Sequence, residues 1–138
     1  MATKLPDVGG LNLLSVLFSS TAKTTSFTLQ LFTDANAPAD GDINTTHTVA
    51  AGGGYADKTL SNNATVALES GIPVATWAAQ TWTFTGALTS GATIRGYQVL
   101  SGTTLLFEET FGTPFTPANN GDQMTFTPKY ALGNGTPT

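Results

Sequence analysis

The stretch SFTLQLFT, residues 26–33, alternates apolar and polar side chains from one position to the next. Phe27, Leu29 and Leu31 fall on one side of an extended chain, opposite threonine and glutamine. A period of two is typical of a β-strand with one buried side and one solvent-facing side. The stretch therefore predicts a half-buried strand, and the same period recurs further along the chain.

Several other segments have strand character. QTWTFT (80–85) and the region 124–132 repeat the alternation, while residues 92–100 and 103–111 are apolar on both sides, as in central or covered strands. Weaker strand candidates are residues 47–51, 64–69 and 74–78. Turn residues separate these segments, and no helical period follows. The pattern predicts an all-β fold, an antiparallel β-sandwich or jelly roll of about 7–8 strands.

The predicted β domain extends over residues 23–132, with a frayed tail over residues 133–138. Pro128 lies within the last predicted strand. Because proline cannot donate a backbone hydrogen bond, we expect this strand at a sheet edge or at a bulge.

The N-terminal segment, residues 1–22, contains the apolar run LNLLSVLF (11–18) after a glycine pair. The apolar positions at helical spacing are Leu11, Leu14, Leu17 and Phe18. We expect a short helix after the glycines or, alternatively, an extended arm. In either form, this apolar face must be buried against its own sheet or against a neighbouring molecule.

The composition excludes several classes of function. The 138 residues contain no cysteine, which excludes disulfides, thiolate metal sites and cysteine nucleophiles. Only 5 residues are basic against 9 acidic, and the basic ones are scattered, so we expect no nucleic-acid binding. The apolar N-terminal run is too short and polar to span a membrane. Charged residues make up only 10%, which suits a protein held in a tight assembly.

The segment DANAPADGDIN, residues 34–44, has the composition of a calcium loop. Counted from Asp40, the oxygen ligands Asp40, Asp42 and Asn44 occupy the first, third and fifth positions. However, the sixth position is threonine instead of glycine and the twelfth is alanine instead of glutamate. We predict a polar turn without metal or cofactor, and only a calcium ion shared between neighbouring copies stays open.

The titratable residues give little basis for catalysis. His47 is the only histidine, and we expect a structural or solvent-facing role for it. Glu108 and Glu109 are adjacent, so on a strand they point to opposite faces and form no carboxylate pair. We therefore predict no catalytic residues and no enzyme activity.

Two charged residues lie in otherwise apolar strands. Glu109 shares its strand face with leucine and phenylalanine, so it must lie at a rim, in an ion pair or at an interface. Arg95 is the only arginine, and it either pairs with a glutamate of the same chain or contacts a neighbouring subunit. Among the aromatic residues, Trp82 is expected in the core, while Tyr55 and Trp77 are candidates for stacking on a sugar ring.

Five stretches together carry a resemblance. They are LQLFTDANAPADGD (29–42), GGYADKTL (53–60), TWTFTG (81–86), IRGYQVLSGTTLLFEETF (94–111) and PFTPANNGDQMTFTPKYAL (114–132). In this order, after the short apolar N-terminal segment, they resemble a family of small β proteins encoded among the virion genes of tailed bacteriophages. That family includes head decoration, or cement, proteins.

The resemblance implies a virion structural protein on the outer capsid surface, where it would stabilise the shell. Its partners would be the major capsid protein and further copies of itself, for example as a trimer around local symmetry axes. The N-terminal segment and the charged pair Arg95 and Glu109 are then interface candidates. The alternative is a receptor- or glycan-binding domain of a tail or fibre, with Tyr55 and Trp77 in the binding platform.

Overall fold

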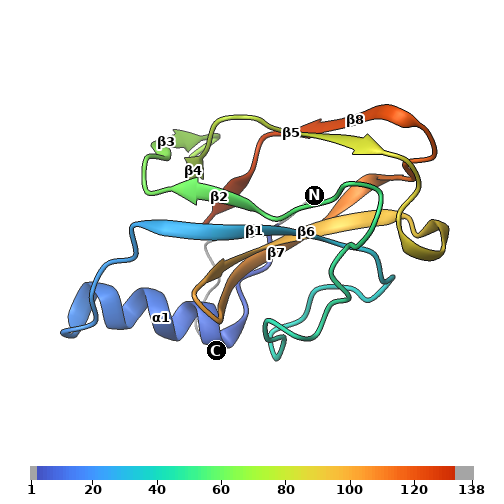
Figure 1. Ribbon diagram of the computed structural model, residues 1–138. Coiled ribbons are helices and arrows are strands. Elements are labelled where there is room, and N and C mark those ends of the chain that lie inside the picture. The colour runs from blue at the N-terminus through green and yellow to red at the C-terminus, as the bar shows by residue number, and fades with distance from the viewer. Residues whose placement is uncertain (1–2, 133–138) are drawn as a thin grey trace.

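The computed structural model of the protein describes residues 3–132 and is mostly β, with antiparallel strands and one N-terminal helix (Figure 1). The expected all-β class with a short N-terminal helix is confirmed, and the predicted tail over residues 133–138 lies outside the described residues. In chain order the elements are α1 (Asp7–Phe18), β1 (Ser26–Phe32), β2 (Lys58–Ser61), β3 (Thr65–Glu69), β4 (Ile72–Thr76), β5 (Gln80–Thr85), the 3-10 turn η1 (Thr89–Gly91), β6 (Ile94–Ser101), β7 (Thr104–Phe115), β8 (Asn120–Phe126) and β9 (Lys129–Ala131).

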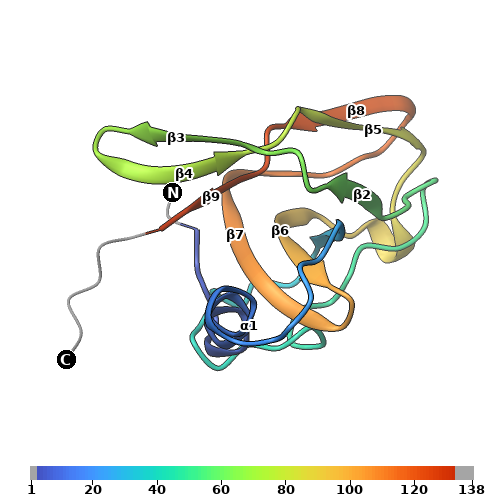
Figure 2. The same cartoon turned by 90° about the vertical axis from the view of Figure 1, so that its left-hand side faces the viewer.

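The strands form three antiparallel sheets. The largest has the order β2-β1-β6-β7, and the other two are β3-β4-β9 and the pair β5-β8. Figures 1 and 2 show the two smaller sheets on one side of the four-stranded sheet, with α1 and the long connection between β1 and β2 on the other. The finer expectation of a sandwich or jelly roll stays a prediction, because the strands are divided among three sheets.

Most predicted strands are confirmed, with differences where the alternation is short. The region 124–132 belongs to two strands. Strand β8 ends before Pro128, and β9 begins after it and pairs with β4 in another sheet. Residues 47–51 form only a single bridge, between Phe32 and Val49. Strand β2 was not predicted, since Leu60 is the single buried residue among its four.

The core lies between the four-stranded sheet and the β5-β8 pair. Its residues are Leu29, Leu31, Ala50, Leu60, Trp82, Phe84, Leu88, Ile94, Tyr97, Val99 and Phe107. The expected burial of Trp82 is confirmed, and its indole nitrogen donates a hydrogen bond to the carbonyl of Ala56 at 2.9 Å. Each large apolar side chain buried in this way contributes about 1.5–3 kcal/mol. One side of the sheet is therefore an ordinary apolar interior.

Helix α1 packs directly against β7, and Gly9 is the reason that it can. A Cβ atom at this position would overlap the backbone carbonyl of Leu106, whereas one at Gly10 would meet only an ordinary contact with Leu5. The prediction that the helix follows the glycine pair was wrong, because α1 begins at Asp7 and includes both glycines. Tertiary contact with β7 here outweighs the low helix propensity of glycine.

Candidate functional site

The second face of the four-stranded sheet carries a row of polar side chains. Gln30 on β1, Gln98 on β6 and Glu108 on β7 are neighbours across the strands. The connection between β1 and β2, residues 33–57, is called the β1–β2 loop below, and it covers this face (Figure 1). Gln98 donates a hydrogen bond to Gln30, and both Gln98 and Glu108 are completely buried.

His47 from the β1–β2 loop lies among three carboxylates. Its Nδ1 atom is 2.9 Å from Oδ1 of Asp34, and its Nε2 atom is 3.1 Å from Oε2 of Glu108 and 3.9 Å from Oδ2 of Asp42. The His47 side chain is inaccessible to solvent, and Asp42 is only 12% exposed. The expected structural role of His47 is consistent with this position, but the solvent-facing alternative was wrong.

The imidazole of His47 is held from its flat side by Phe32. The two rings are stacked with their centroids 4.0 Å apart and their planes 13° from parallel. Phe32 in turn lies over Gly96 of β6, where any Cβ atom would overlap the phenyl ring. A glycine on the central strand therefore creates the space in which the phenylalanine orients the histidine.

Asp34 fixes the other end of the imidazole. Burial raises the pKa of Asp34, but hydrogen bonds from His47 and from the backbone N–H of Thr48 outweigh this and hold its pKa below the usual range. An ionised carboxylate can only accept, so Nδ1 of His47 carries the proton that is donated to Asp34. In the neutral imidazole, Nε2 then presents a lone pair toward Glu108 and Asp42.

Glu108 is the most unusual group in this cluster. Its pKa is raised to about 8, mainly by burial and to a smaller extent by the negative charge of the nearby Asp42. Within residues 3–132, neither carboxylate oxygen of Glu108 nor Nε2 of His47 has a hydrogen-bond partner of good geometry. Buried polar atoms are rarely left in this state, because each costs about 1–3 kcal/mol.

The candidate ligands from the sequence are separated in the structure. Of Asp40, Asp42 and Asn44, only Asp42 points into the cluster, and its Oδ2 also accepts a hydrogen bond from the backbone of Ala39. The side chain of Asp40 pairs with Lys4 at the surface. Asn44 contributes only its backbone carbonyl, which lies 3.5 Å from the amide nitrogen of Gln98.

The residues that the structure adds to Asp42 are His47 and Glu108, and donor atoms of all three lie within 4.8 Å of one another. Imidazole nitrogen and carboxylate oxygen are donors for divalent cations of the zinc class. One local signal for Glu108 is its position in a largely apolar strand, where it shares a face with Leu106 and Thr110. Nothing local in the sequence joins it to His47.

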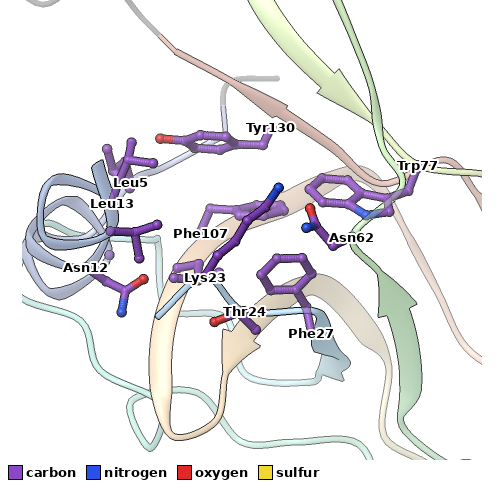
Figure 3. Close-up of a pocket in the computed structure, with 13 residues that line it drawn as sticks. Leu5, Asn12, Leu13, Lys23, Thr24, Phe27, Asn62, Trp77, Phe107 and Tyr130 are labelled. Carbon is purple, nitrogen blue, oxygen red and sulfur yellow. The ribbon is translucent and has the colours of Figure 1, made fainter. Parts of the chain in front are cut away.

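A second feature is an apolar pocket of about 210 Å³ between α1 and the sheets (Figure 3). Its walls are Leu5, Gly9, Asn12, Leu13, Val16, Lys23, Thr24, Phe27, Asn62, Trp77, Leu106, Phe107 and Tyr130. Burial raises the pKa of the Tyr130 hydroxyl, which has no hydrogen-bond partner within residues 3–132. The pocket is therefore mostly apolar, but it includes a buried hydroxyl without a partner in the described residues.

The outer face of α1 is the third feature. Leu11, Leu14, Leu17 and Phe18 are 65%, 55%, 64% and 82% exposed. The face that carries the apolar residues at helical spacing is thus not buried against the sheet of the same chain. Of the two alternatives from the sequence, packing on its own sheet was wrong, and contact with a neighbouring molecule stays a prediction.

The remaining candidates lie apart from one another. The ring of Trp77 packs against Phe27 and Phe107, and its nitrogen donates to the carbonyl of Ser61. The hydroxyl of Tyr55 donates to Asp57 and accepts from the backbone of Leu31. Both aromatic residues proposed for a sugar platform are therefore engaged within the chain.

The predicted pair of Arg95 with a glutamate is not formed. Within residues 3–132, Arg95 has no carboxylate within 4.0 Å, and it lies half-buried beside Asp34, Thr110 and Pro114. Glu109 instead accepts a hydrogen bond of 2.8 Å from the hydroxyl of Tyr97. The position of Glu109 on an apolar stripe is explained by this bond, and its expected role at an interface stays a prediction.

No family model matches the chain, and comparisons with curated proteins and with solved structures give no match. No helix in the described part of the chain has the length and apolar character needed to cross a membrane.

Proposed function

We propose that the chain is a non-enzymatic structural subunit of a phage virion, a capsid decoration protein that binds the outer head surface through α1. The observation that carries the docking role is the outer face of α1, where four large apolar side chains are more than half exposed. Contiguous apolar side chains of this kind are typical of surfaces that bind another protein. The virion assignment rests on the sequence resemblance.

The geometry of α1 supports a docking role because the helix cannot turn this face inward. Gly9 fits against the carbonyl of Leu106, and any rotation that brought Leu11 or Leu14 to this position would place a large side chain against the backbone. The inner face also holds Leu13 and Val16 at the pocket wall. The outer face is therefore available to the major capsid protein.

The β3–β4 hairpin supports self-association. Strand β3 is exposed along its whole length and forms an edge of its sheet, and it presents Val66 and Leu68 to solvent. An exposed edge strand carries free backbone donors and acceptors that can pair with a strand of another chain. Copies joined in this way would form a closed homo-oligomer, for example a trimer around a local symmetry axis of the shell.

Co-sedimentation with heads assembled from the accompanying major capsid protein tests the proposal. The Leu14→Ser/Leu17→Ser double variant should lose head binding by at least about 10-fold, because each removed leucine forfeits apolar burial at the contact. Ile43→Ser is the matched control, since Ile43 is an exposed apolar residue of the β1–β2 loop. Equal binding by the double variant and the control would contradict the proposal.

The alternative of a tail or fibre domain that binds a receptor or glycan makes a different prediction. Such a domain should adsorb to host cells and ignore empty heads, and substitution of Trp77 should abolish adsorption. The intramolecular contacts of Tyr55 and Trp77 do not favour this alternative over decoration.

A further inference from the structure

We propose that Asp42, His47 and Glu108 bind one divalent cation of the zinc class, which ties the β1–β2 loop to β7. The inference goes beyond the proposed function and does not depend on it, because the site lies inside a single chain. It concerns a different set of donors from the calcium loop considered in the sequence. Only Asp42 is common to both.

The first argument is the orientation of His47. Asp34 accepts the Nδ1 proton, which leaves Nε2 as a lone-pair donor aimed at Glu108, 3.1 Å away. A carboxylate behind a histidine is the usual arrangement at metal sites, where it fixes the ring and increases the basicity of the metal-binding nitrogen. Phe32 stacks on the ring and prevents it from turning away.

The second argument is the set of polar atoms that lack a partner. Nε2 of His47 and both oxygens of Glu108 are buried and lack a hydrogen-bond partner within residues 3–132. One donor atom each of Asp42, His47 and Glu108 lies within 4.8 Å of the other two. Two electron-rich atoms at 3.1 Å repel each other unless a cation or a proton lies between them. A bound cation would satisfy these atoms together.

The third argument is charge. Three carboxylates, Asp34, Asp42 and Glu108, surround one histidine, and Lys4 pairs with Asp40 at the surface instead. No lysine or arginine within residues 3–132 lies within 4.0 Å of any of the three carboxylates. Buried carboxylates in excess of their cationic partners are normally neutralised by protons or by metal ions. A divalent cation supplies the missing positive charge.

The distances favour a small cation with a histidine ligand over calcium. Two ligands at about 2.0–2.1 Å from a tetrahedral ion lie roughly 3.3 Å apart. The separations of 3.1 Å and 3.9 Å from Nε2 of His47 lie on either side of that value. Calcium requires six to eight oxygen ligands, and imidazole nitrogen is a poor donor to it.

The consequence for the fold is a link between distant segments. Asp42 and His47 belong to the β1–β2 loop, whereas Glu108 belongs to the middle of β7. The loop contains no helix or strand of its own, so a cation shared with β7 would hold it against the sheet. A tetrahedral zinc ion held by three protein donors has one coordination position left, which a water molecule can occupy.

Isothermal titration of the full-length, chelator-treated protein with ZnCl₂ tests the site, with CaCl₂ and MgCl₂ titrated for comparison. We expect one zinc ion per chain and a rise in Tm of about 5 °C or more at saturation. Glu108→Gln should weaken zinc binding by at least about 10-fold, and Asp34→Asn, which acts through the histidine, by about 10–100-fold. Asp40→Asn, at the surface of the same loop, should bind zinc as the unmodified chain does.

Asp42→Asn provides a second ligand variant on the loop if Glu108→Gln fails to fold. The protein can also be loaded with Co²⁺ and its visible absorption spectrum measured. Absorption bands of a low-coordinate cobalt ion that are lost in the Asp42→Asn variant would support the site independently. Zinc binding that is unaffected by both ligand variants would overturn the proposal, and so would the absence of saturable binding. Preference for calcium over zinc would also overturn it. None of these results depends on binding to phage heads, so the two proposals fail separately.

Discussion

Helix α1 and the β1–β2 loop cover the same face of the four-stranded sheet, and they distribute their side chains in opposite ways (Figure 2). The helix turns leucines and a phenylalanine toward solvent, while the loop turns a histidine and carboxylates toward the interior. Each distribution is unfavourable for an isolated chain. For each we have proposed a partner that would make it favourable, a protein surface for the helix and a cation for the loop.

The other side of the same sheet shows the contrast. There Leu29, Tyr97 and Phe107 belong to an aromatic and aliphatic core, and the indole of Trp82 has its hydrogen bond. The core side is packed from residues of the chain itself, and both proposed partners would bind on the side covered by α1 and the loop.

The largest predicted effect comes from removing the imidazole of the buried cluster. His47→Leu deprives Asp34 of its hydrogen bond from Nδ1 and places an apolar side chain against the buried Glu108, which should lower the free energy of unfolding of the chelator-treated protein by about 3–5 kcal/mol. Urea denaturation followed by circular dichroism measures the change. Asp40→Asn is the control and should stay within about 0.5 kcal/mol. A loss below about 1 kcal/mol for His47→Leu would show that the cluster is not integral to the fold.

An intermediate effect is expected at the contact of α1 with β7. Gly9→Ala places a Cβ atom against the carbonyl of Leu106 and should destabilise the protein by about 1–3 kcal/mol. Gly10→Ala meets only an ordinary contact with Leu5 and should stabilise the protein by up to about 1 kcal/mol, because alanine favours the helix. The two substitutions are the same and lie at adjacent positions of α1. Equal urea midpoints of unfolding for the two variants would therefore contradict the described packing of α1.

The smallest effect on stability is expected on the outer face of α1. Leu17→Ser should change the free energy of unfolding by no more than about 0.5 kcal/mol, because the side chain is exposed. Leu13→Ser, on the pocket wall, should cost more than about 1 kcal/mol. Thermal denaturation of both variants compares the two faces. A larger loss for Leu17→Ser would mean that the outer face is buried within the monomer.

The sequence predicted the strands whose side chains alternate over six or more residues, such as those starting at Ser26 and Gln80. It missed β2, because four residues with one buried leucine carry too little pattern. The start of α1 was misplaced because glycine propensity disfavours a helix through Gly9, and the compensating contact with Leu106 lies far away in the chain. Sequence periodicity predicts an element where the pattern extends over many residues. Where the pattern is short, contacts with distant parts of the chain determine the structure.

The buried cluster could not be predicted from a local motif, for a similar reason. A calcium loop is recognised by ligands at fixed positions within one segment, and only Asp42 belongs to the segment 34–44. His47 and Glu108 join it through the folding of the β1–β2 loop over β7. Exposure of the outer face of α1 could not be predicted either, because the same spacing of leucines fits burial against the chain itself or against a neighbour.

The proposed docking of α1 on another protein surface in the assembled virion can be measured directly, because the chain contains no cysteine. Leu14→Cys on α1 and Thr83→Cys on β5 introduce single thiols at exposed positions. Maleimide labelling should modify both variants in the free protein, but in purified particles it should modify only Thr83→Cys. Equal labelling of Leu14→Cys in the free protein and in particles would contradict the claim.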